Sequence, residues 1–383
     1  MRYLEISQAL KPDRIVSVDA LRGFDMLWIL GGDGVVWALD DMLRDKGPIA
    51  SGIGSFLRAQ LDHAPWDGFR FYDFIFPLFI FVTGIAIVPS LTRLVVREGR
   101  AKAHVRVLRR ALLLYALGLV YYGGISEHWG DIRLFGVLQR IGICYLFASL
   151  MFLNFNLRGL VVAFAALLVG YWALLTFVPV PDIGAASFAP DANLADWIDA
   201  HYLPGRLWEK TRDPEGMLST LPAIGSCLLG VFAGLLLNDR RLTPQQKSLW
   251  LIGAGVVLLA AGLLWSVQFP IIKAIWTSSF VLVAGGWSAI LLGISYQIID
   301  VWGQKGLATI FVWVGANAIM LYLLNGIMGF ETFAARFVGG DVAAFLDGDV
   351  SAGAGSFMAY ALGLVFAVAL AGFLYRRKIF LRV

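Results

Sequence analysis

The sequence predicts an all-α, polytopic integral membrane protein with about ten transmembrane helices in one bundle. Of its 383 residues, 59% are hydrophobic and only 15% are charged, whereas a soluble domain is nearer half apolar and a quarter charged. Thirteen Trp and 27 Phe fit helices edged by interfacial aromatic residues. Apolar runs of about 20 residues, enough to cross a bilayer, recur along the whole chain.

The apolar runs define ten predicted spans, which we treat as a single transmembrane domain over residues 1–383. Six spans lie at 15–39, 69–92, 107–124, 134–153, 159–180 and 217–237, and four more at 249–269, 275–298, 307–330 and 355–375. The motifs described below occupy the spans within 15–237, and 249–375 holds the remaining helices. An even number of spans places both termini on the same side of the membrane.

Charge asymmetry predicts that both termini are cytoplasmic. With that orientation the inner segments hold 19 Lys and Arg and five Asp and Glu, against 10 and 18 in the outer segments. Cytoplasmic loops of membrane proteins carry such an excess of basic residues. Because the basic residues flank the spans, the pI near 9 requires no nucleic acid partner, and the lipid bilayer is the expected surrounding.

Ionisable residues converge on one layer near the outer end of the spans. Asp33, Asp73 and Arg140 lie about 6–10 Å below the outer surface, given 1.5 Å of rise per residue. His63 lies just above them, and histidine exchanges protons near neutral pH. The layer also includes Gln139, Asp213 and Glu215, with Trp66 and Asp67 at its mouth. Charged groups at this depth are costly and usually functional, so the layer predicts a polar cavity.

Simpler explanations stay open for parts of this layer. Asp73 and Arg140 are expected to form an ion pair, because buried charges are usually paired. Asp213 and Glu215, in the run RDPEG, resemble a helix start, where carboxylates suit the positive end of the dipole. The outer loop 181–216 is either a lid over the cavity or a solvated connection.

A second charged layer, near the inner face, contains Arg22, Arg109 and Arg110. Arginines at this depth could bind phosphate groups as bidentate donors, or they could anchor lipid headgroups and fix the topology. Cys144 and Cys227 lie inside apolar spans without metal-ligand spacing. Neither a disulfide nor a metal site is therefore predicted.

Four sequence blocks together resemble the heparan-α-glucosaminide N-acetyltransferase family, in particular its bacterial NagX-type or DUF5009 members. They are SVDALRGFDM, HAPWDGFRFYDFIFPLFIFVTG, RLFGVLQRIGICYL and RDPEGMLSTLPAIGSCLLGVFAG, which follow the family order and cover most of the first 235 residues. The last four spans match mainly in hydropathy and around Asn317.

The resemblance implies a transmembrane acyltransferase of the bacterial inner membrane. It would move an acetyl group from cytoplasmic acetyl-CoA to the amine of a glucosamine-type amino sugar on the periplasmic side, without a metal. The family's catalytic histidine corresponds to His63. Its active-site asparagine corresponds to Asp33, and this departure favours a role in holding the acceptor's ammonium group. The inner arginines would bind the CoA phosphates, and association into a homodimer is left open.

Acyl transfer to an amine requires a general base, a polarised carbonyl and exclusion of water. We expect His63 to be the base, acting directly on the acceptor, while Asp33 orients the acceptor or assists His63. The main alternative is a secondary transporter for an amino sugar or a cell-wall sugar fragment, with the same layer as a proton relay. A structural or regulatory subunit accounts least well for the convergence.

Overall fold

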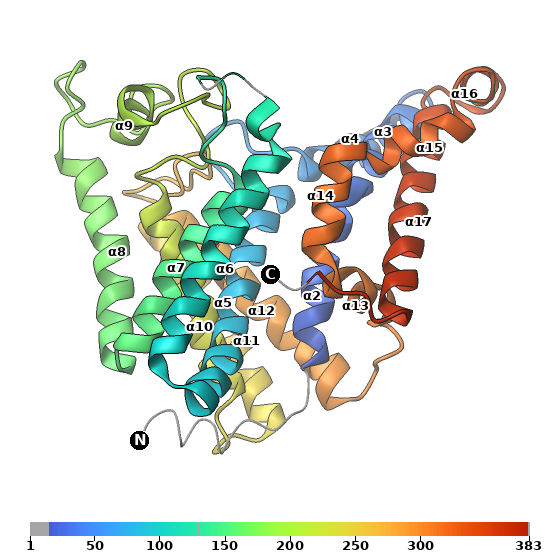
Figure 1. The fold of residues 1–383 in the computed structure, drawn as a ribbon. Helices are drawn as coiled ribbons and strands as arrows, with labels where there is room; N and C mark the ends of the chain where they lie inside the picture. The colour runs from blue at the N-terminus through green and yellow to red at the C-terminus, as the bar shows by residue number, and fades with distance from the viewer. Residues whose placement is uncertain (1–14, 127, 129, 382–383) are drawn as a thin grey trace.

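The computed structural model describes residues 15–126, 128 and 130–381, and it confirms the all-α fold (Figure 1). In this part of the chain, extended pairing is confined to two isolated bridges, Asp67 with Ile272 and Arg133 with Gly205. The predicted cytoplasmic positions of the two termini concern residues 1–14 and 382–383, which lie outside the described residues.

Seven helices among the described residues are long and apolar enough to cross a membrane. They are α5 (Phe71–Glu98), α7 (Val137–Asn154), α8 (Leu157–Phe177), α10 (Thr220–Leu237), α11 (Pro244–Trp265), α12 with its π-helical extension (Ser278–Val301) and α17 (Ala354–Arg376). The pair α13 (Thr309–Ala316) and α14 (Ala318–Met328), bent by 74°, makes an eighth if it is one span. The predicted total of about ten is not confirmed.

Two further predicted spans are not among these helices. The first, 15–39, is divided into α2 (Val16–Leu27), a π-helical turn (Trp28–Gly32) and α3 (Asp33–Leu43). Gly31 in that turn has φ of 123°, a conformation that glycine adopts without steric cost. The other, 107–124, is the second half of α6 (Arg100–Tyr121), whose first half is rich in Lys and Arg.

Glycines bring the backbones of neighbouring helices into direct contact. A Cβ added at Gly84 of α5 would lie 2.0 Å from the Cys227 carbonyl oxygen, and one at Gly230 of α10 would lie 1.9 Å from the Phe81 carbonyl oxygen. Small residues permit this close approach of helices in a membrane. Gly23 of α2 is packed in the same way against α13. These contacts fix helices on both sides of the cavity described below.

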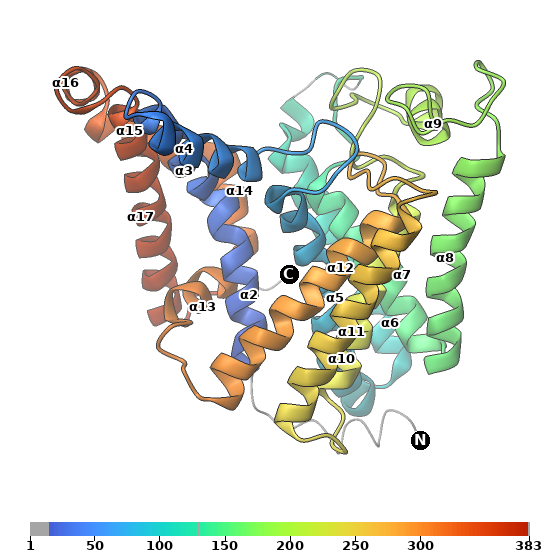
Figure 2. The ribbon, with the colours of Figure 1, turned by 180° about the vertical axis from the view of Figure 1, so that it is seen from behind.

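The two views show one bundle, with α8 and α17 at opposite sides and α5 near its centre (Figures 1 and 2). The short helices α4 (Pro48–Leu61), α9 (Leu194–Tyr202), α15 (Phe330–Val338) and α16 (Asp341–Phe345) gather at one end. We call this the outer end, because the segments that charge asymmetry assigns to the outside meet there. The connections from α5 to α6 and from α10 to α11 lie at the opposite, inner end.

Candidate active site

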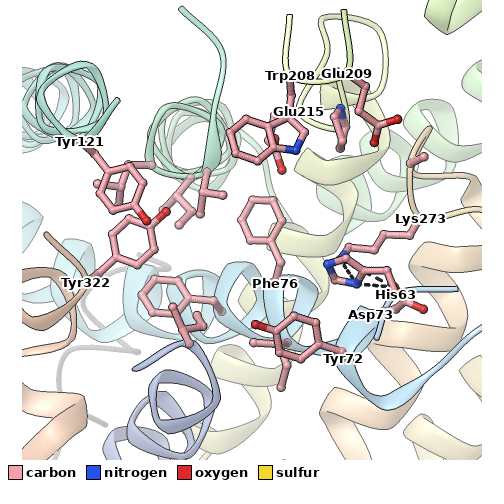
Figure 3. Close-up of a pocket in the computed structure, with 18 of the residues that line it drawn as sticks. His63, Tyr72, Asp73, Phe76, Tyr121, Trp208, Glu209, Glu215, Lys273 and Tyr322 are labelled. Carbon is pink, nitrogen blue, oxygen red and sulfur yellow. Dashed lines mark hydrogen bonds and ion pairs between the residues drawn. The ribbon is translucent and has the colours of Figure 1, made fainter. Parts of the chain in front are cut away.

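A cavity of about 480 Å³ lies between the helices near the outer end. Helices α5, α6, α7 and α14 supply its walls, and the loops before α5, before α10 and before α12 supply its rim (Figure 3). Four of the predicted site residues line it: His63, Trp66, Asp73 and Glu215. A cavity therefore lies at the predicted height, but most of its lining is apolar, and several of the residues predicted for a polar cavity lie behind its wall.

Asp73 and His63 form a hydrogen-bonded dyad at the rim. His63 Nδ1 lies 2.9 Å from Asp73 Oδ1, and the histidine side chain is 51% exposed while the aspartate is fully buried. Asp73 Oδ2 accepts the backbone N–H groups of Ala64 and Arg70 at the start of α5. Because an ionised carboxylate only accepts, this contact favours the tautomer with the proton on Nδ1 and the lone pair on Nε2.

Lys273 stands beside this dyad, on the loop before α12 (Figure 3). Its Nζ lies 2.9 Å from His63 Nδ1, 3.0 Å from His63 Nε2 and 3.7 Å from Asp73 Oδ1. The bridge between Asp67 and Ile272 holds this loop against the segment that carries His63. Burial lowers the pKa of Lys273 to about 8, although Asp73 and Glu215 act in the opposite direction. The rim thus joins a base, a carboxylate and a cation.

Asp33 lies behind Tyr72 and does not line the cavity. Tyr72 donates its hydroxyl hydrogen to Asp33 Oδ2 at 2.7 Å, and Asp33 Oδ1 accepts the N–H of Gly34. The ring of Tyr72 lies with its centroid 5.0 Å from that of His63. An acceptor in the cavity would therefore meet Tyr72 first. This geometry fits the expectation that Asp33 assists His63 better than direct contact with the acceptor's ammonium group.

Arg133 holds the two carboxylates that precede α10. Its guanidinium contacts Asp213 at 2.8 Å and Glu215 at 2.6 Å, and only 2% of the arginine side chain is exposed. The rings of Tyr122 and Trp208 lie 4.5 Å from the guanidinium carbon. Burial alone would lower the pKa of Arg133, but Asp213 and Glu215 hold it above its ordinary value. Asp213 is structural, whereas Glu215 also reaches the cavity.

The predicted ion pair between Asp73 and Arg140 is wrong. Arg140 is fully buried in α7, where it donates to the Gly216 carbonyl and to the Ser219 hydroxyl. Its guanidinium carbon lies 5.0 Å from the centre of the Trp276 ring. The two residues share a depth, but they point toward different neighbours.

Three other predicted site residues also serve the wall of the cavity. Gln139 is fully buried and donates to the Arg133 carbonyl oxygen at 3.3 Å. Trp66 lines the cavity and donates to the Phe188 carbonyl oxygen at 2.9 Å, while the Arg212 guanidinium lies over its ring. The Asp67 side chain is exposed, and the backbone of Asp67 makes the bridge to Ile272.

The outer loop 181–216 forms part of the cavity wall. It contributes Trp208, Glu209, Arg212 and Glu215 to the lining, so it is more than a solvated connection. Asp199 of α9 anchors it, because Asp199 Oδ1 accepts the N–H of Met217 at 2.8 Å. Burial raises the pKa of Asp199 to about 7, and burial raises that of Asp196 to about 6.

A smaller cavity of about 210 Å³ lies deeper in the bundle and is lined by Arg22 and Arg110. It shares four lining residues with the outer cavity: Phe79, Leu138, Ile141 and Ile319. Arg109 is exposed and does not line it. Asn317, fully buried at the bend between α13 and α14, lies beside its wall without lining it. Of the three arginines predicted near the inner face, Arg22 and Arg110 therefore line this cavity, and Arg109 does not.

Lys273, Tyr72, Arg133 and Trp208 are site residues that sequence reasoning missed. Arg133 and Lys273 are basic residues on loops predicted to be outside, where the positive-inside rule makes such residues less common. Their placement on outer loops could therefore have marked both as candidate site residues. Tyr72 is adjacent to Asp73, but nothing in the sequence indicates that its hydroxyl reaches Asp33.

Fold and site together define a multi-pass helical membrane protein with an Asp–His–Lys group at the rim of a cavity. The chain is 26% identical to the heparan-alpha-glucosaminide N-acetyltransferase of Homo sapiens over 85% of its length, covering 54% of that protein. It is 26% identical to the enzyme of the same name from Mus musculus, over 68% of this chain and 48% of the relative. No protein-family model matches the chain. These similarities confirm the resemblance to the heparan-α-glucosaminide N-acetyltransferase family, and the chain spans about half the length of the curated relatives it matches.

Proposed function

We propose that this chain is a transmembrane N-acetyltransferase that moves an acetyl group from acetyl-CoA to the amine of a glucosamine-type amino sugar. The observation that carries the proposal is the 2.9 Å contact between His63 Nδ1 and the buried Asp73 at the rim of a cavity. A carboxylate that fixes the tautomer leaves Nε2 as a directed base. The names of the two relatives supply the class of reaction.

In this reaction the amine nitrogen of the acceptor attacks the thioester carbonyl carbon. The new C–N bond forms, the C–S bond breaks, the CoA sulfur leaves as a thiolate, and the amine proton passes to His63 Nε2 and from there to the thiolate. Lys273 Nζ, 3.0 Å from Nε2, is close enough to donate to the carbonyl oxygen as negative charge develops on it. Tyr72, held by Asp33, would position the acceptor.

Acetyl-CoA would supply the acyl group as an activated thioester. The residues of the inner cavity fit its phosphates, because Arg22 and Arg110 both line that cavity and the buried Nε of Arg110 has no hydrogen-bond partner among the described residues. The shared lining between the two cavities gives an apolar route for an extended chain toward His63. We further propose that the protein lies in a bacterial inner membrane, as the resemblance to bacterial members of the family implies, with both termini cytoplasmic, as the charge asymmetry indicates.

Transfer of labelled acetyl from acetyl-CoA to glucosamine by the purified protein tests the proposal. We expect His63→Ala to lower the rate by about 10²–10⁴-fold, the usual worth of a general base. Thermal stabilisation by acetyl-CoA should persist in this variant. His201→Ala is the matched control, because His201 lies on α9 and does not line the cavity. Wild-type activity in His63→Ala would remove His63 from the mechanism, and uptake of labelled sugar into vesicles without CoA would favour a transporter.

A further inference from the structure

The cations that line the outer cavity are all engaged by carboxylates. Among the described residues that line it, the Lys and Arg side chains are Arg133, Arg212 and Lys273. Arg212 contacts Glu209 at 2.6 Å and Asp191 at 3.5 Å. Arg133 and Lys273 have the carboxylate partners described above. An anionic ligand at Arg133 or Lys273 would therefore have to displace an existing ion pair, whereas the buried Nη1 of Arg212, 3.5 Å from Asp191, has no hydrogen-bond partner among the described residues.

Aromatic rings pack against both guanidinium groups as well. The rings of Tyr122 and Trp208 each lie 4.5 Å from the guanidinium carbon of Arg133, and Arg212 lies 4.9 Å from the centre of the Trp66 ring. A guanidinium recognises a sulfate or carboxylate through a free edge with two parallel N–H donors. In Arg133 that edge is taken by Asp213 and Glu215.

The ion-pair cluster around the cavity carries more carboxylates than cations. Three cations and three carboxylates, Asp73, Glu209 and Glu215, line the cavity itself, and two further carboxylates, Asp191 and Asp213, lie behind the lining in the same ion pairs, so the cluster as a whole has a formal charge of −2. Apart from the residues already counted, the wall loop 181–216 holds three Asp and two Lys or Arg, a further excess of one acidic residue. A field of this sign attracts a cationic ligand and repels an anionic one.

From these contacts we propose that the acceptor is an amino sugar whose only charge is its ammonium group, and that the cavity discriminates against amino sugars bearing sulfate or carboxylate. This inference rests on the proposed function and names the substrate class of the same site. The surrounding carboxylates attract the ammonium form, His63 accepts the amine proton, and the C–H face of a neutral sugar ring packs against the rings of Trp66 and Trp208. Discrimination here comes from repulsion as much as from attraction.

Glucosamine and glucosamine 6-sulfate form a matched pair of acceptors for the test. We expect kcat/KM to be roughly tenfold or more lower for the sulfated sugar, because juxtaposed like charges suppress wrong partners. The difference should narrow as ionic strength rises. Equal or faster transfer to the sulfated sugar would overturn the inference. If no acetyl group is transferred to either sugar, the proposed function fails, and thermal stabilisation by the same two sugars still decides which one the cavity accepts.

A charge reversal at the rim separates electrostatic selection from shape. Glu209 is 40% exposed and has Arg212 as its partner, so Glu209→Lys changes the sign of the rim without opening the bundle. We expect the ratio of kcat/KM for glucosamine to kcat/KM for glucosamine 6-sulfate to fall at least several-fold in this variant. Glu209→Gln should lower the same ratio by less. Glu98→Lys, at the inner end of α5, is the matched control and should leave the preference unchanged. An unchanged preference in Glu209→Lys would count against selection by charge.

Discussion

At the scale of single residues, Asp73 is the group on which most of the site depends. One oxygen begins α5 by accepting two backbone N–H groups, and the other orients His63. The same carboxylate is the counterion of Lys273. A buried carboxylate with this many partners is held rigidly, and such rigidity is what a preorganised base requires.

Lys273 supplies a prediction about pH. Its pKa of about 8, lowered by burial, means that its ammonium loses a proton as the pH rises through about 8. The cationic partner of Asp73 and the proposed donor to the carbonyl oxygen would then be lost together. We expect acetyl transfer by the native protein to decline above about pH 8. Lys273→Arg should extend activity to higher pH, because a guanidinium stays charged to about pH 12.

The pH–rate profile of kcat checks this prediction. Lys46→Arg is the matched control, because Lys46 lies in the exposed turn after α3 and does not line the cavity. Superimposable profiles for the native protein and Lys273→Arg would show that the charge of Lys273 is not used.

Depth relative to the span ends predicted that His63 and Asp73 lie near the outer end, where both line the cavity, but it could not identify their partners. A residue's distance from a span end fixes its height in the membrane and leaves its direction around the helix axis free. Asp73 and Arg140 share a height, and yet Asp73 faces the rim while Arg140 faces Gly216 and Ser219. Lys273 comes from a loop 200 residues from Asp73 along the chain, and only the assembled bundle brings them together.

At the scale of elements, the contact between α5 and α10 holds the wall that carries Asp73. A Cβ at Gly230 would lie 1.9 Å from the Phe81 carbonyl oxygen, so the two backbones must separate to admit one. We predict that Gly230→Ala lowers the free energy of unfolding by about 1–3 kcal/mol, the usual cost of overpacking. Unfolding of the purified protein in detergent measures it. Gly253→Ala, in α11 with nothing within 4 Å, should be neutral, and equal effects would contradict the packing argument.

The loop that carries α9 supplies a second prediction about pH. Burial raises the pKa of Asp199 to about 7, so the folded protein binds this proton more tightly than the unfolded chain does. The free energy of unfolding therefore falls as the pH rises from about 4 to about 7. Asp199→Asn, which keeps an oxygen for the N–H of Met217, should match the native protein near pH 4 and be more stable at pH 8.

Thermal unfolding at the two pH values checks the Asp199 prediction. The gain at pH 8 should be on the order of a few kcal/mol, at about 1.4 kcal/mol for each unit of pKa shift. Asp182→Asn is the control, since that side chain is 69% exposed. A loss of stability in Asp199→Asn at pH 8 would show that the ionised carboxylate is needed to hold Met217.

Hydropathy predicted where the helices lie better than it predicted where a helix is interrupted or bent. The long apolar helices α5, α8 and α12 lie close to the predicted spans at 69–92, 159–180 and 275–298. The π-helical turn at Gly31 and the 74° bend at Asn317 were not predicted. Gly31-Gly32 and Asn317 interrupt runs that remain apolar on both sides. The mean hydropathy over a window of residues therefore stays high there and does not reveal the break.

At the scale of the whole molecule, the bundle contains an outer and an inner cavity that are lined by different chemical groups. The outer cavity has the dyad and the acidic rim, and the inner one has the guanidinium groups of Arg22 and Arg110. The four lining residues they share are apolar and stand on α5, α7 and α14. This arrangement suits a reaction whose two substrates enter from opposite sides of a membrane and meet between them.

Narrowing the shared wall tests that view of the molecule. Ile319 of α14 lines both cavities, so Ile319→Trp should fill the space between them without touching His63 or the inner arginines. We predict at least a tenfold loss of acetyl transfer from acetyl-CoA, because the thioester carbonyl can no longer reach the base at bonding distance. Stabilisation by glucosamine, which we propose binds in the outer cavity, should be retained. Ile327→Trp is the control on the same helix, since Ile327 is 63% exposed. If Ile319→Trp transfers acetyl at the native rate, the acyl donor reaches His63 by a route that does not pass the residues shared by the two cavities. The proposal that the two cavities hold the two substrates of one reaction would then lose its support.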